Sequence, residues 1–93
     1  MDHMYIRHTV GSALLLDTKK HNLRYELQEA EGTWVFVITV KDKELAEQVL
    51  RSRHEINLFV VPEADPSKKV WYYSKDGIVD YDSTQGELRV VAD

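Results

Sequence analysis

The chain has 93 residues, of which 43% are hydrophobic and 30% are charged, and it carries a formal net charge of −4 and no cysteine. This composition indicates one globular domain rather than a disordered chain. It excludes disulfides and thiol chemistry, and the acidic balance disfavours a general nucleic-acid binder. No apolar stretch approaches the roughly 18 residues of a membrane span, and no signal-peptide pattern is present, so we expect a cytoplasmic protein.

The amino-terminal third predicts two strands. His3-Met4 matches the dipeptide that a common cloning site leaves behind, so we interpret residues 1–3 as a cloning remnant and 4–93 as a single domain. Residues 4–16 predict a strand broken near Gly11-Ser12, because glycine inside a strand pattern marks a bulge or bend. Residues 23–28 alternate between apolar and polar side chains, which is typical of a half-buried strand.

The middle of the chain predicts a strand followed by a helix. Residues 33–40 are apolar on both faces, so we expect this strand to be central in its sheet or covered on both sides. Asp42 is a suitable N-cap for an amphipathic helix over 43–53. The apolar stripe of this helix consists of Leu45, Ala46, Val49 and Leu50.

The carboxyl-terminal part predicts four strands. Residues 57–61 form a buried type of strand that Pro62 ends. Residues 69–74 and 78–81 flank Lys75-Asp76-Gly77, and Asp-Gly predicts a hairpin because both turn positions tolerate positive φ. Residues 87–91 complete the series after a turn at 83–86.

These elements predict an α+β fold with a mostly antiparallel, curved sheet. We expect about six or seven short strands, in the order three strands, one helix, four strands. The amphipathic helix near 43–53 is expected to pack on one face. Because one helix cannot cover so many strands, the sheet either curls into a partial barrel or meets another chain.

Two basic segments are candidate binding sites. The first is a run of aromatic and basic residues, in which the rings could stack on a ligand while the lysines bind its negatively charged groups. Its members are Lys68, Lys69, Trp71, Tyr73 and Lys75, and Tyr81 from the next predicted strand is added to them. Its alternative interpretation is a hairpin with aromatic cross-strand packing. The second segment contains Lys19, Lys20 and Arg24 and could bind an anion or an acidic partner. The alternative for this segment is a solvated loop.

No spacing of His, Asp or Glu indicates a metal site, and we expect no cofactor. No catalytic motif is present, so we expect a protein that is not an enzyme. The leading hypothesis is a non-enzymatic interaction protein that acts through protein–protein contacts and forms a homo-oligomer. Small acidic domains of this kind occur among phage and bacterial accessory proteins, including inhibitors of larger host machines. The alternative is a protein that sequesters a nucleotide or another small ligand with the surface around 68–75.

Overall fold

The computed structural model describes residues 2–93, which form seven strands and one α-helix. The strands are β1 (His3–His8), β2 (Leu14–Asp17), β3 (Tyr25–Ala30), β4 (Thr33–Thr39), β5 (Ile56–Val61), β6 (Val70–Asp82) and β7 (Glu87–Ala92). The helix α1 (Lys43–Arg51) lies between β4 and β5, and a short 3-10 helix, η1 (Pro66–Lys68), precedes β6. The predicted combination of a mostly antiparallel sheet with one helix is confirmed.

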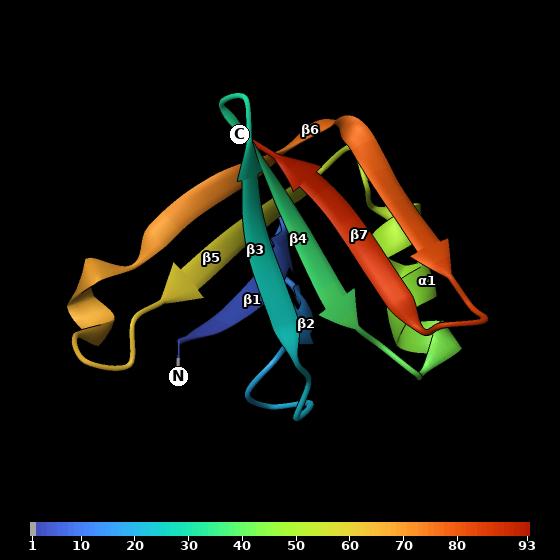
Figure 1. The fold of residues 1–93 in the computed structure, drawn as a ribbon, viewed down its shortest axis with the longest axis horizontal. Helices are drawn as coiled ribbons and strands as arrows, with labels where there is room; N and C mark the ends of the chain where they lie inside the picture. The colour runs from blue at the N-terminus through green and yellow to red at the C-terminus, as the bar shows by residue number, and fades with distance from the viewer. Residues whose placement is uncertain (1) are drawn as a thin grey trace.

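The seven strands form one strongly curved sheet in the order β2-β1-β5-β6-β7-β4-β3. Every neighbouring pair is antiparallel. In Figure 1, β3, β4 and β7 cross in front of β1, β2 and β5, and β6 bends from one layer into the other. The inner faces of the two layers therefore enclose the core, while β2 and β3 are left as the edges of the sheet.

The hairpin predicted at Asp76-Gly77 is wrong, because β6 runs through these residues as one bent strand. Both residues have positive φ, 54° and 65°, as a hairpin turn would require. The two halves of β6 nevertheless pair with different strands, the first with β5 and the second with β7. The register against β7 shifts between Ser74 and Val79, so the positive-φ pair forms a bulge that bends the strand.

The predicted distribution of strands around the helix is also corrected. Four strands precede α1 and three follow it, because residues 4–16 form two strands and residues 69–81 belong to one. Gly11 and Ser12, with φ of 79° and 55°, lie in the turn between β1 and β2. The dipeptide that makes a two-residue hairpin with positive φ is Glu31-Gly32, between β3 and β4.

The helix begins where its sequence predicts. The Asp42 carboxylate accepts hydrogen bonds from the backbone N–H groups of Glu44 and Leu45, at 3.0 and 3.3 Å. The helix ends at Arg51 rather than at 53. Its residues Ala46 and Val49 are fully buried, and it lies against β2 and β6.

The core fills the space between the two layers of the sheet. β4 is paired on both sides, with β3 and β7, but it lies one place from the edge rather than at the centre of the sheet as predicted; its Phe36 and Ile38 are fully buried. The other fully buried large side chains are Met4, Ile6, Leu16, Val40, Val49, Ile56, Leu58, Leu88 and Val90. Within residues 2–93, no helix has the length and apolar character needed to cross a membrane.

Candidate functional site

The outer face of β1, β5 and β6 carries a row of aromatic side chains, which we call the aromatic ladder. It consists of Tyr5, Phe59, Trp71 and Tyr73. Strand register places Tyr5 opposite Phe59 and Phe59 opposite Trp71. Because side chains alternate along a strand, all four point away from the core. Trp71 and Tyr73 are each 53% exposed.

The rings of the aromatic ladder overlap one another. The centroids of Tyr5 and Phe59 are 4.9 Å apart with an angle of 21° between the ring planes, and those of Phe59 and Trp71 are 5.7 Å apart at 19°. Nearly parallel rings at these distances are offset-stacked rather than laid flat side by side. The faces of the inner rings are therefore covered by their neighbours. Trp71 and Tyr73, at 5.0 Å and 33°, form the exposed end of the row.

Two cations lie over the other end of the aromatic ladder. The Nζ of Lys69 is 3.2 Å from the Tyr5 hydroxyl and 5.1 Å from the centroid of Phe59. The Cζ of Arg7 is 5.3 Å from the centroid of Tyr5, and one of its nitrogens donates to the backbone oxygen of Ser12 at 2.7 Å. These contacts are within the range of cation–π attraction. The surface is thus aromatic and locally basic on a chain with net negative charge.

The structure brings three of the predicted site residues together, namely Lys69, Trp71 and Tyr73. Tyr72 lies on the opposite face of β6, where it is 9% exposed and packs edge-on against Trp34 and Phe36. The alternation along β6 therefore separates an inner tyrosine from an outer aromatic pair.

The remaining predicted residues of this segment lie elsewhere. Lys68 is exposed at the end of η1. The Nζ of Lys75 is 3.8 Å from a carboxylate oxygen of Asp93. Tyr81 lies in the second half of β6, packs on the core and donates a hydrogen bond of 2.7 Å to the backbone oxygen of Val40. The structure thus does not join Tyr81 to the exposed pair.

The second predicted segment lies beside a cleft of about 430 Å³. Lys19 and Arg24 line this cleft together with Tyr25, whereas Lys20 is exposed outside the lining. Asp17 accepts hydrogen bonds from the backbone N–H groups of Lys19 and Lys20, at 2.8 and 3.3 Å, and so shapes the turn. Two acidic residues, Asp2 and Glu63, also line the cleft. The cleft therefore carries charges of both signs.

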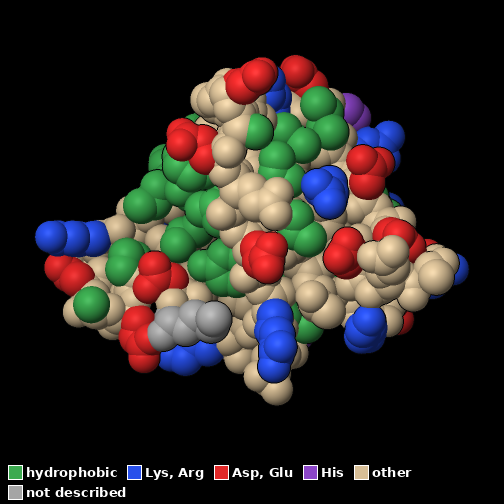
Figure 2. Space-filling model, in the orientation of Figure 1, with side chains coloured by type: hydrophobic (Ala, Val, Ile, Leu, Met, Phe, Trp, Pro, Cys, Tyr) green, Lys and Arg blue, Asp and Glu red, His purple; other side chains and the backbone are tan. Residues whose placement is uncertain are grey.

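A mostly apolar groove continues from this cleft between β3 and β5, and it is lined by Asp2, Tyr25, Leu27 and Val60. Figure 2 shows hydrophobic side chains gathered in this part of the molecule, with acidic ones around the margin. Burial raises the pKa of the Tyr25 phenol above its ordinary value of 10.0, and the charges of Asp2 and Tyr72 add to the rise. Burial likewise raises the pKa of Tyr72. Both phenols thus remain neutral at physiological pH.

Tyr5, Phe59 and Arg7 are site residues that sequence reasoning missed. Tyr5 and Arg7 lie in β1, far along the chain from residues 68–75, and Phe59 lies in β5, the strand before β6, so no spacing within one segment links them to Trp71. The available signal is alternation: Tyr5 and Arg7 flank the fully buried Ile6, and Phe59 follows the fully buried Leu58. Alternation identifies outward-facing side chains but not the neighbouring strand.

Comparisons with protein-family models, curated proteins and solved structures found no match for this chain. Among residues 2–93, no three His, Asp or Glu side chains gather closely enough to hold a metal ion.

Proposed function

We propose that this protein is a non-enzymatic interaction protein that binds an acidic protein partner through the aromatic ladder. The observation that carries the proposal is the exposed pair Trp71 and Tyr73, which continues a stacked row flanked by Lys69 and Arg7. Tryptophan, tyrosine and arginine are the residues that most often dominate the binding energy of protein interfaces.

The stiffness of the aromatic ladder supports this role. Tyr5 and Phe59 are held by stacking and by strand pairing, so these side chains would lose little entropy when a partner binds them. Lys69 and Arg7 would complement acidic side chains at the rim of the partner and would accelerate association. Salt should therefore weaken binding mainly through the association rate.

A nucleotide-binding or ligand-sequestering function is the second candidate. Trp71 and Tyr73 have exposed ring surface on which a base could stack, and Lys69 is near. The geometry favours a protein partner because the inner rings already cover one another, so only the exposed end of the row offers a stacking face.

The test uses a photo-crosslinking amino acid at Tyr73 and, as a matched control, at Ile78, which is exposed in the second half of β6. We also propose, from its size and acidic composition, that the chain is a phage or bacterial accessory protein, so the lysate should be bacterial. We expect a specific adduct from position 73, and we expect Lys69→Glu to reduce it. Equal adducts from both positions, or no effect of Lys69→Glu, would contradict the proposal.

Two further outcomes distinguish the alternatives. An adduct between two copies of this chain would identify the partner as itself, in line with the proposed homo-oligomer. For a nucleotide, a Trp34→Phe variant leaves Trp71 as the one tryptophan, since the chain has two. A change in its emission across a nucleotide panel, lost in Lys69→Glu, would favour the ligand-binding function.

A further inference from the structure

We propose a second binding surface, at which an extended segment of a partner protein adds a strand along β3. The segment would have apolar and basic residues in alternation. Its apolar side chains would enter the groove beside Tyr25, Leu27 and Val60, and its basic side chains would lie on the opposite face, beside Glu26. This surface is separate from the aromatic ladder, because Val60 and the ladder residue Phe59 lie on opposite faces of β5.

The backbone of β3 has an open side. β3 ends the sheet, and no strand of residues 2–93 pairs beyond it (Figure 1). The backbone oxygen of Arg24 accepts a hydrogen bond from the N–H of Thr39, which continues the β3–β4 pairing by one residue. Because the pairing alternates along an antiparallel strand, residues 25, 27 and 29 turn their N–H and C=O groups toward the open side. Such an edge can bind an extended peptide.

The other edge strand of the sheet, β2, is a poorer site for strand addition. β2 has four residues, against six in β3, and it lies against α1. Short or covered edges are a common protection against strand addition. β3 is therefore the edge at which a partner strand fits.

The groove gives the added strand a place for alternate side chains. Tyr25 and Leu27 are half-buried and point into the groove, whereas the side chains of Glu26 and Gln28 are exposed on the other face of β3. On the far wall, the nearly buried Val60 pairs in register with Val70, which is exposed. An apolar side chain from the added strand would cover part of this surface.

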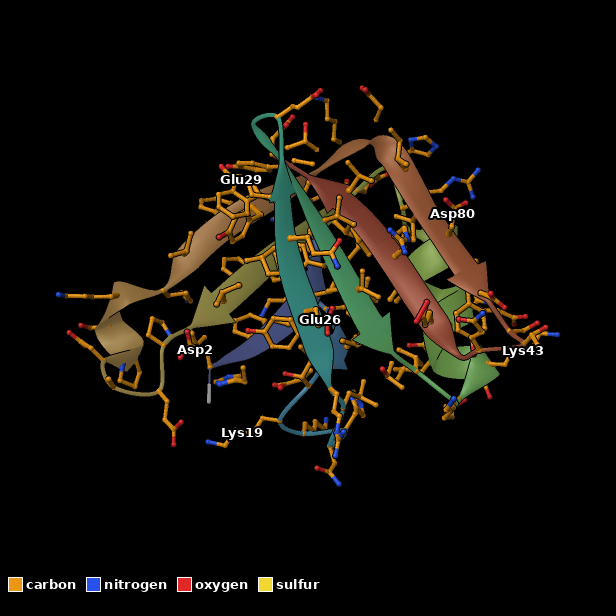
Figure 3. All side chains as sticks on the ribbon, in the orientation of Figure 1. Asp2, Lys19, Glu26, Glu29, Lys43 and Asp80 are labelled. Carbon is orange, nitrogen blue, oxygen red and sulfur yellow. The ribbon has the colours of Figure 1, made fainter. Side chains whose placement is uncertain are left out.

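Charge identifies the occupant. Glu26, Glu29 and Glu31 outnumber the basic Arg24 that precedes β3, and neither Glu26 nor Glu29 has an ion-pair partner among residues 2–93. Glu26 lies on the face where the basic side chains of the added strand would lie, whereas Glu29 shares the groove face with Tyr25 and Leu27. Figure 3 shows Glu26 and Glu29 on the same strand, with Glu29 toward its upper end. A second copy of β3 paired antiparallel would add its own glutamates to this acidic edge, which is unfavourable. A strand with basic residues would instead be attracted.

The test uses an octapeptide of alternating valine and lysine, with blocked ends, and the Trp71→Phe variant of the full chain. The remaining reporter is Trp34, which lies opposite Glu29 in the β3–β4 register. We expect the peptide to change the emission of Trp34 and to slow amide hydrogen exchange at residues 25, 27 and 29. The Glu26→Gln variant, which removes the carboxylate on the face where the lysines would lie, should weaken binding by roughly two- to fivefold, as for an exposed charge pair.

The matched control is Asp80→Asn, which removes an exposed strand carboxylate in the second half of β6, away from β3 (Figure 3). This variant should bind the peptide as the parent does. Alternating valine–glutamate and serine–lysine peptides should bind much more weakly. The proposal is overturned if the valine–lysine peptide leaves Trp34 and the amides unchanged, if the valine–glutamate peptide binds equally, or if Glu26→Gln has no effect.

Size-exclusion chromatography completes the test. A dimer of this chain in which the amides of residues 25, 27 and 29 exchange slowly without any peptide would make a second copy the occupant and would overturn the proposal. These outcomes are independent of the aromatic ladder, whose Lys69→Glu variant should bind the peptide normally.

Discussion

The phenol of Tyr81 donates a hydrogen bond of 2.7 Å to the backbone oxygen of Val40. Tyr81 belongs to β6 and Val40 follows β4, and the two strands are separated in the sheet by β7. The N–H of Val40 in turn donates to the backbone oxygen of Gly86, at 2.7 Å. Both backbone polar groups of Val40, which connects β4 to the helix, are therefore hydrogen-bonded.

Replacing Tyr81 with phenylalanine should lower the free energy of unfolding by about 0.5–1.5 kcal/mol, because the hydrogen bond to Val40 is lost while the ring remains. Urea denaturation measures this as a lower midpoint at an unchanged slope. Tyr73→Phe is the matched control, because Tyr73 is exposed at the surface. Equal stabilities of the two variants would contradict a structural role for the Tyr81 hydroxyl.

A second substitution tests the buried hydroxyl of Thr18, which is 5% exposed. Its oxygen accepts from the N–H of Met4 at 3.0 Å, and the hydroxyl donates to the backbone oxygen of Met4 at 3.1 Å. Thr18→Val preserves the shape but leaves the Met4 N–H unpaired, so we expect a loss of about 1–3 kcal/mol in thermal or chemical unfolding. The exposed Thr9→Val should stay within about 0.5 kcal/mol of the parent. A neutral Thr18→Val would contradict a stabilising role for this hydroxyl.

Gly77 requires glycine for two reasons. Its φ is 65°, and a Cβ at this position would overlap the imidazole of His54. Gly11 has a similar φ of 79°, but a Cβ there would meet nothing within 4 Å, so Gly11→Ala should incur only the backbone cost of about 1–2 kcal/mol. Gly77→Ala should be more destabilising than Gly11→Ala, and adding His54→Ala should recover the difference. A double-mutant cycle with no coupling would contradict this contact.

The raised pKa values of Tyr25 and Tyr72 predict a loss of stability in alkali. Both phenols hold their protons more tightly in the folded chain than at the ordinary pKa of 10.0. Their contribution is complete below pH 10.0 and is lost as the pH rises through the folded pKa values, because the folded state then binds more protons than the unfolded state. When tyrosinate absorbance is followed against pH, part of the increase should occur above the ordinary pKa of tyrosine. The Tyr25→Phe and Tyr72→Phe variants should each reduce this high-pH part of the increase. Ordinary titration of all five tyrosines would contradict it.

Several elements follow from local sequence because their causes are local. Asp42 caps the helix with its own side chain, and the apolar stretch at β4 indicates a strand with neighbours on both sides, which the sheet order shows. The alternation of Trp71 and Tyr73 with Tyr72 likewise predicts that one set faces inward. These features depend on neighbours within a few residues of one another.

The path of β6 depended on the tertiary structure. Asp76-Gly77 and Glu31-Gly32 both have positive φ, yet only the second forms a hairpin. The difference is that β3 and β4 pair with each other, whereas the two halves of β6 find separate partners in β5 and β7. Local dihedral preference permits either result, and the long-range pairing selects between them.

The same distinction holds for the candidate surfaces. The sequence by itself determined that Lys69, Trp71 and Tyr73 share a segment and that residues 23–28 alternate in polarity. Only the tertiary structure placed Tyr5 and Phe59 beside Trp71 and left the edge of β3 open next to Val60. The physical reason is that strand order is set by contacts between residues distant in the chain, which no local pattern encodes.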